Sequence, residues 1–250
     1  METNTVSPEP QFLAALIAAI AAIASAMYSR QSQLSVVRLS AQLEHERRQE
    51  ERSAELEQIM ARFSEGLGQA AYDLQSRLYN ILKLNLIGTY VVSGDERSQS
   101  YVINNTVFLI AQYFAWAEII RRDVQFVDLG ESERTQNLTR LRDNIYSIWQ
   151  SDQYGPLFRV FAGEQRAIGE HMIREGPRGL ECIGYAEFLN RTDLQEDSLL
   201  NALRSDVLSL RNKLPNAQPR LVALHHTLIN LLDFFDPDYV RFPQERRKKA

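Results

Sequence analysis

The sequence predicts an all-α protein with a single N-terminal transmembrane helix, a long polar helical stalk and a cytoplasmic helical bundle. Three observations point to this class: an uncharged apolar run near the N-terminus, a following stretch without proline or glycine, and apolar residues at helical spacing through the remainder. The expected boundaries of the N-terminal tail, the transmembrane helix, the stalk, the bundle and a basic C-terminal tail are 1–11, 12–28, 29–63, 64–240 and 241–250.

The composition limits the kinds of partner. Charged and apolar residues make up 24% and 44% of the 250 residues, so the chain has enough apolar material for a core. The net charge of −4 provides no general attraction to nucleic acid, and we expect no nucleic-acid partner. The single cysteine, Cys182, cannot form an internal disulfide, which fits a reducing compartment.

The run FLAALIAAIAAIASAMY at residues 12–28 is the expected membrane anchor. A helix needs about 17 to 25 apolar residues to cross a bilayer core, and this run is near the lower limit. A cleaved signal peptide is one alternative, with Ala24-Ser25-Ala26 as its cleavage site, although no Lys or Arg precedes the run. A buried soluble helix is the other, although nothing local would cover it. We favour an uncleaved anchor, and whether it is ever cleaved stays open.

Basic residues predict the orientation of the anchor. No Lys or Arg comes before residue 12, whereas Arg30, Arg38, Arg47 and Arg48 follow the run closely. Because basic residues are retained on the cytoplasmic side, the N-terminus is expected outside and the body of the protein in the cytoplasm.

The expected stalk is polar on every face over residues 44–55, EHERRQEERSAE. Such a helix serves as a solvated spacer that side-chain pairs stabilise, for example Glu44 with Arg48 and Arg47 with Glu50. Alternatively, the stalk is a coiled coil that makes a homo-oligomer, although its apolar seam has a gap. That seam would contain Leu34, Val37, Ala41, Leu56, Met60, Phe63 and Leu67. Gly66 and Gly68 are expected to break or bend the helix that follows.

The body is expected to contain about six to seven helices because apolar residues recur there at helical spacing. Gly and Pro clusters separate these segments. The predicted helices lie at 70–90, 101–122, 133–151, 157–174, 180–190, 198–214 and 220–235, with loops that include 93–95 and 128–130.

Charged residues on the predicted bundle helices form one candidate site. They are Glu118, Arg159, Glu164, Arg166 and Glu170. Arg166 is spaced to pair with Glu170, and Gly163 and Gly169 would let another backbone approach closely. One interpretation is a polar pocket that receives an anion, and the other is an ion-pair network that fixes how the helices pack.

Sequence motifs for catalysis and metal binding are missing. A di-iron bundle needs Glu-x-x-His, structural zinc needs Cys and His at set spacings, and phosphate loops need glycine-rich motifs, none of which the chain contains. A weaker candidate is His226 with Asp233, which share a helix face and resemble an oriented general base without a nucleophile. We therefore predict no catalytic residue, no metal and no cofactor.

The basic C-terminal tail, which includes Arg246, Arg247, Lys248 and Lys249, has two interpretations. It could contact anionic lipid headgroups, at about 1 kcal/mol for each basic residue near the surface. It could instead be a disordered solubilising tail.

Three segments resemble a bacterial family of membrane-anchored helical proteins that has no assigned activity. They are AYDLQSRLYNIL at residues 71–82, QYFAWAEI at 112–119 and GEQRAIGE at 163–170. The resemblance would cover roughly residues 70–240. It implies an all-helical body at a bacterial inner or plasma membrane, and it supplies no catalytic residue, substrate or cofactor.

The sequence as a whole favours a non-enzymatic role. We expect a single-pass, membrane-tethered interaction or regulatory module with a protein partner of unknown identity. The alternative is a ligand-binding or hydrolytic bundle with a polar pocket around Arg159, Glu164 and Arg166.

Overall fold

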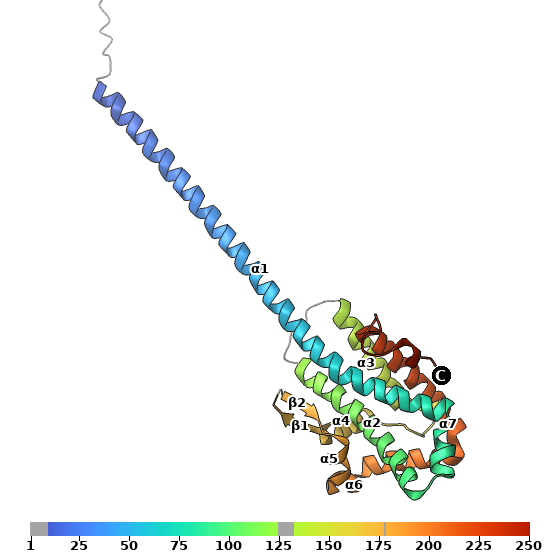
Figure 1. Ribbon diagram of the computed structural model, residues 1–250. Helices are drawn as coiled ribbons and strands as arrows, with labels where there is room; N and C mark the ends of the chain where they lie inside the picture. Colours follow the sequence, from blue (N-terminus) through green and yellow to red (C-terminus); the bar gives the residue numbers. More distant parts are fainter. Residues whose placement is uncertain (1–9, 125–132, 178) are drawn as a thin grey trace, which may run out of the picture. The chain divides into compact units, whose positions relative to one another are not determined.

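A computed structural model describes residues 10–124, 133–177 and 179–250 (Figure 1). About 82% of the structure is helical, which confirms the all-α class. The chain divides into two compact units, Met1–Gln58 and Ile59–Ala250. Most of the expected N-terminal tail, residues 1–9, and the expected loop at 128–130 lie outside the described residues.

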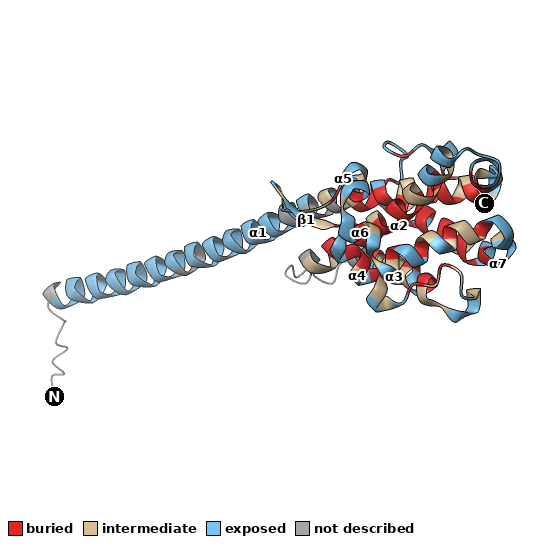
Figure 2. Ribbon diagram, turned by 90° about the horizontal axis from the view of Figure 1, so that it is seen from below, coloured by how far each residue is buried: buried red, intermediate tan, exposed pale blue. Residues whose placement is uncertain are grey.

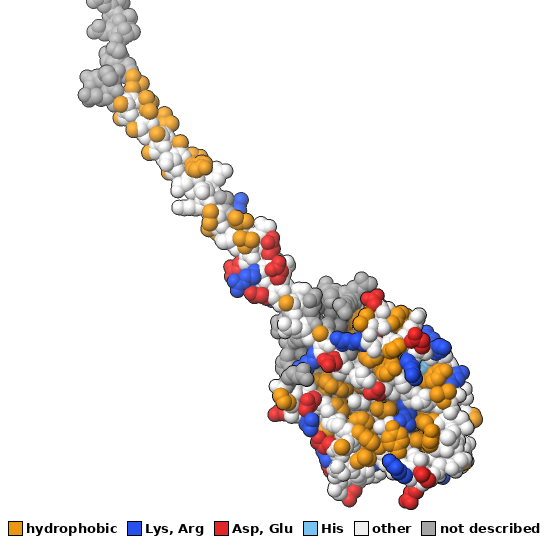
Figure 3. All heavy atoms as spheres, viewed as in Figure 1, with side chains coloured by type: hydrophobic (Ala, Val, Ile, Leu, Met, Phe, Trp, Pro, Cys, Tyr) orange, Lys and Arg blue, Asp and Glu red, His pale blue; other side chains and the backbone are white. Residues whose placement is uncertain are grey.

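The N-terminal unit contains the first part of helix α1 (Pro10–Lys83). Its described side chains are exposed, including the large apolar side chains of Phe12, Ile17 and Ile23 (Figure 2). The stretch Phe12–Ala54 is long and apolar enough in part to cross a membrane, judged by length and composition alone. Figure 3 shows apolar side chains at the start of α1 and acidic and basic side chains further along it.

In the C-terminal unit, α1 does not end or break at Gly66 and Gly68, and the expected break is wrong. These glycines instead make room for aromatic side chains. A Cβ atom on Gly66 would lie 2.4 Å from the ring of Trp116, and one on Gly68 would lie 3.3 Å from the ring of Phe242. Helix α1 ends at Lys83, and Asn85 follows in the left-handed region with φ 52°.

The core of the C-terminal unit lies between long helices (Figure 2). A short π-helical turn, Gly88–Val92, leads into the buried helix α2 (Glu96–Val124). Helix α2 packs against α4 (Ala162–His171) and α7 (Ser198–Phe235), and α7 also packs against α3 (Glu133–Gln150). Two short helices, α5 (Tyr185–Asn190) and α6 (Thr192–Glu196), precede α7.

A small hairpin replaces the end of the helix expected at 157–174 and the start of the one expected at 180–190. Strand β1 (Ile173–Gly176) pairs antiparallel with β2 (Gly179–Cys182), with Ile173 opposite Cys182. Gly179 has φ +101°, a conformation that a helix does not contain and that glycine adopts readily. An ion pair of 3.0 Å between Arg174 and Glu181 links the two strands.

Helix α4 begins five residues later than expected. Phe158 has a positive φ of 56°, and Phe161 is extended at the N-cap, so the chain cannot be helical from 157. The side chain of Glu164 accepts a hydrogen bond of 2.8 Å from the Phe161 amide and so caps the helix start.

Helix α7 joins the two helices expected at 198–214 and 220–235. Its interior contains one non-helical residue, Lys213, just before Pro215 and Pro219, so the expected interruption is present as a kink. Asp197 caps the helix by accepting a hydrogen bond of 2.8 Å from the Leu200 amide.

The basic C-terminal tail is folded onto the unit, and the interpretation as a disordered tail is wrong. Phe242 is buried and stacks on Tyr72 at 5.1 Å between ring centroids. The guanidinium group of Arg247 is buried and pairs with Asp233 and Asp236. Contact with anionic lipid stays a prediction for the tail's other basic residues, Arg241, Arg246, Lys248 and Lys249, all of which are exposed.

Candidate functional site: an arginine-lined cavity

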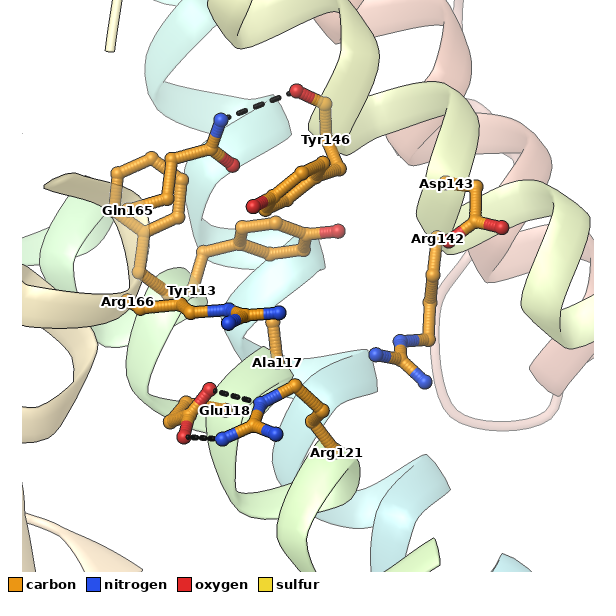
Figure 4. A pocket seen from close by; sticks show the side chains of 10 residues that line it. Tyr113, Ala117, Glu118, Arg121, Arg142, Asp143, Tyr146, Gln165 and Arg166 are labelled. Carbon is orange, nitrogen blue, oxygen red and sulfur yellow. Dashed lines mark hydrogen bonds and ion pairs between the residues drawn. The ribbon is translucent and has the colours of Figure 1, made fainter. Parts of the chain in front are cut away.

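A cavity of about 240 Å³ lies between α2, α3 and α4 (Figure 4). Its base is formed by buried side chains, among them Tyr113, Phe114 and Gln165. Asp143 and Arg166 are exposed at its rim. The full lining comprises Tyr113, Phe114, Ala117, Glu118, Arg121, Arg142, Asp143, Tyr146, Gln165 and Arg166.

The carboxylate of Glu118 is fully engaged by neighbouring arginines of α2. Arg121 donates two hydrogen bonds to it, of 2.7 and 2.6 Å, and Arg122 donates a third of 2.9 Å. Burial alone would raise the pKa of Glu118, but these hydrogen bonds lower it. Glu118 is therefore ionised at neutral pH and holds the arginines in place, so it is not suited to act as a general acid.

Arg142 of α3 differs from the other cavity arginines because its Nε atom is buried and has no hydrogen-bond partner among the described residues. Burial lowers the pKa of Arg142, yet a guanidinium group stays protonated in proteins. A buried cation without a hydrogen-bonded anion is costly, and this makes Arg142 the most informative residue of the cavity.

The polar groups of the cavity converge on one space. In Figure 4 the guanidinium groups of Arg142 and Arg166 and the hydroxyl of Tyr113 point into it from α3, α4 and α2. Burial raises the pKa of Tyr113, so its hydroxyl stays neutral and can donate a hydrogen bond. Gln165 does not take part, because its side-chain amide donates to the carbonyl oxygens of Tyr146 and Val160 at 3.1 and 2.9 Å.

The structure brings together three of the five charged residues predicted from the sequence. Glu118 and Arg166 both line the cavity. Glu170 adjoins them through Arg122, which bonds to Glu170 at 3.1 Å as well as to Glu118. The expected pair between Arg166 and Glu170 does not form, since Glu170 pairs with Arg122 instead.

Arg159 and Glu164 lie outside the lining of this cavity. Arg159 pairs with Asp152 and lies over the ring of Phe161 at 5.1 Å from its centroid. Glu164 caps the start of α4. The pocket expected around Arg159, Glu164 and Arg166 is therefore placed differently by the structure, with Arg166 as the only shared residue.

The two glycines of α4 have different surroundings. A Cβ atom on Gly169 would lie 2.6 Å from the carbonyl oxygen of Phe114, so this glycine allows α2 and α4 to approach closely, as expected. Gly163 has nothing within 4 Å of such an atom, so the same expectation is wrong there.

The weaker candidates do not form a site together. His226 contacts the carbonyl oxygen of Ala250 at 3.2 Å, whereas Asp233 pairs with Arg247 at 2.9 Å. Burial raises the pKa of the Cys182 thiol to about 12, so it is a poor nucleophile at neutral pH. Within the described ranges, no group of three or more His, Cys, Asp or Glu residues is placed to hold a metal ion.

Arg142, Arg121 and Tyr146 are cavity residues that the sequence did not single out. Of these residues, only Arg142 could have been found from the sequence pattern, because it lies four residues after Leu138 and three before Ile145. That spacing places a cation next to the apolar face of its helix. An arginine in this position requires a partner or a function.

Comparison with known proteins does not assign the site. No protein-family model, curated protein or solved structure matches the chain.

Proposed function

We propose that the protein is a single-pass, membrane-tethered helical module with an interaction or regulatory role. The observation that supports it is the apolar helical run at residues 12–28, whose described side chains are all exposed, whereas the C-terminal unit buries most of its large apolar residues. A surface of this length and composition is stable in a bilayer and costly in water. The polar helix that follows is then a spacer, and the C-terminal unit is the working part in the cytoplasm.

Fractionation of cells that express the chain tests the tether. The full chain should stay with the membrane after a carbonate wash, and a chain lacking residues 1–28 should move to the soluble fraction with its helical circular dichroism retained. Recovery of the full chain in the soluble fraction would refute the tether. Cleavage after residue 26 would appear as a shortened N-terminus by mass spectrometry and would also refute it.

The identity of the partner and the number of copies are part of the same proposal. A second copy could pair through the expected stalk, residues 29–63, where Val37 and Ala41 of the predicted seam are exposed. The competing interpretation is a monomeric spacer. Deleting residues 29–58 and comparing the mass of the solubilised protein by light scattering distinguishes the two, because a spacer leaves the number of copies unchanged.

A second candidate function is ligand binding by the C-terminal unit, and the unsatisfied Nε atom of Arg142 specifically favours it. Among the described residues, the cavity lining includes no serine, cysteine or histidine, which favours binding over hydrolysis. A ligand that stabilises the unit through this cavity would give the tethered module a means of regulation. Saturable stabilisation of the protein by a small molecule, lost on mutation of the cavity, tests this function.

A further inference from the structure

We propose that the cavity between α2, α3 and α4 binds a small organic acid with one carboxylate and an aromatic or aliphatic body. The proposal rests on the second candidate function, ligand binding in this cavity, and names the chemical class of its ligand. Charge, donor geometry and size each contribute to the choice.

The charge of the lining favours an anion with a single charge. Three arginines line the cavity against two carboxylates, those of Glu118 and Asp143. Because Arg121 is already bonded to Glu118, the excess positive charge belongs to Arg142 and Arg166. One carboxylate on the ligand would balance the lining, whereas a dianionic phosphate would exceed it.

The geometry of the free donors favours a planar acceptor. A guanidinium group presents a flat pair of N–H donors that matches the two oxygens of a carboxylate. Arg142 reaches the cavity from α3 and Arg166 from α4, and the Tyr113 hydroxyl adds a neutral donor from α2 (Figure 4). A carboxylate between these groups would lie against the guanidinium group of Arg142, whose buried Nε atom has no hydrogen-bond partner among the described residues.

The remaining walls favour an apolar body on the ligand. Tyr113, Phe114, Ala117 and Tyr146 contribute apolar surface beside the charged groups. The cavity, at about 240 Å³, is larger than a protein cavity of about 150 Å³ that holds benzene. A ligand of the size of benzoate therefore fits, with its ring against the aromatic wall and its carboxylate toward Arg142.

Calorimetric titration of the full-length chain in lipid nanodiscs tests the proposal, with empty nanodiscs as the blank. The probes are benzoate, its neutral isostere benzamide, phenyl phosphate and inorganic phosphate. Benzoate should bind saturably and more tightly than the other three. Arg142→Gln should weaken benzoate binding by roughly tenfold to a hundredfold, because a hydrogen bond to a charged group is lost.

Arg140→Gln is the matched control, since Arg140 is an exposed arginine of the same helix and lies outside the cavity lining. It should leave benzoate affinity unchanged. Arg166→Gln, at the exposed rim, should also weaken binding and provides a second variant if Arg142→Gln fails to fold.

The outcomes distinguish the proposed carboxylate ligand from the more general proposal that the cavity binds a ligand. If benzamide or phosphate binds as well as benzoate and the Arg142 variant abolishes that binding, the cavity binds ligands but not carboxylates in particular. If none of the four probes binds, both the ligand class and the binding function are refuted. Benzoate binding that both Arg142→Gln and Arg166→Gln leave unchanged would show that the site lies elsewhere and would also overturn the proposal.

Discussion

Replacing Arg220 by methionine removes a buried guanidinium group that holds the connection between α3 and α4, and we expect a large loss of stability. All donor groups of this side chain point at backbone carbonyl oxygens. Nε bonds to Leu157 at 3.1 Å, Nη2 bonds to Ser151 and Gly155 at 2.9 and 2.7 Å, and Nη1 bonds to Trp149 at 2.7 Å and to Ile148.

The magnitude follows from the acceptors that lose their partner. The Trp149 carbonyl keeps a bond from the Val160 amide at 3.0 Å, and the Ser151 carbonyl keeps the bond of the 3-10 helix Asp152–Tyr154, so three carbonyl oxygens lose the guanidinium donor without such compensation. At about 1 kcal/mol for each acceptor left without a partner, the expected loss is about 3 kcal/mol. That is a large part of the roughly 5–15 kcal/mol by which a typical domain is stable.

Urea unfolding of the full chain in detergent, followed by tryptophan fluorescence, measures this loss because Trp149 is buried beside the affected carbonyls. Arg220→Lys should lose less stability, since an ammonium group keeps the positive charge and some of the N–H donors. Arg211→Met, at an exposed position of the same helix, should change stability by less than about 0.5 kcal/mol. A loss below about 1 kcal/mol for Arg220→Met would refute the argument.

Three further substitutions test the packing and the electrostatics of the C-terminal unit. Gly169→Ala should destabilise it by at least about 1–3 kcal/mol, the usual cost of overpacking, because the new Cβ atom would lie 2.6 Å from the α2 backbone. Gly163→Ala, in open space on the same helix, should instead stabilise it by up to about 1 kcal/mol, and equal effects of the two changes in thermal unfolding would contradict the structure. Burial lowers the pKa of His225 from 6.5 to about 4. Between these pH values the unfolded chain binds a proton that the folded chain does not. The free energy of unfolding should therefore decrease as the pH falls through this window, by roughly 3 kcal/mol in total. His225→Leu should flatten this pH dependence, and an unchanged slope would show that another group causes it.

Much of the fold could be predicted because the long helices have strong local signals. Leu138, Ile145 and Trp149 recur at helical spacing, and all three are buried in α3. The cap of α7 at Asp197 was also predictable from local chemistry. The hairpin was not, because strands of four residues are too short to show a clear period and the glycines that bound them also fit a loop.

Glycines were the least reliable signal, because their role depends on distant neighbours. Gly66 lies inside a continuous helix because the ring of Trp116, a residue far away in the sequence, leaves no room for a Cβ atom there. A glycine that ends a helix and a glycine that admits a ring look the same in one sequence. The basic tail illustrates the same limit, since Arg247 pairs with Asp233 near the end of α7 and with Asp236 just after it, residues that precede the tail in the sequence.

The candidate site was predicted in part. The sequence suggested a polar cluster with Glu118, Arg166 and Glu170, and the structure places these three close to one another around Arg122 and the cavity. The sequence could not reveal that Arg142 completes the cavity, because the packing of α3 against other helices depends on the tertiary structure. Arg159 lies outside the cavity lining and pairs with Asp152, which lies in the short 3-10 helix that precedes it.

The proposed tether and its direction are tested most directly by labelling single cysteines with a membrane-impermeant maleimide in cells of a bacterial expression host. Cys182 is replaced by serine, and a single cysteine is introduced as Thr3→Cys or as Lys248→Cys, the latter at an exposed position of the tail. The account predicts that the cysteine at position 3 is labelled in intact cells and that the one at position 248 is labelled only after the membrane is permeabilised. Labelling of position 248 in intact cells, or protection of both positions, would contradict it.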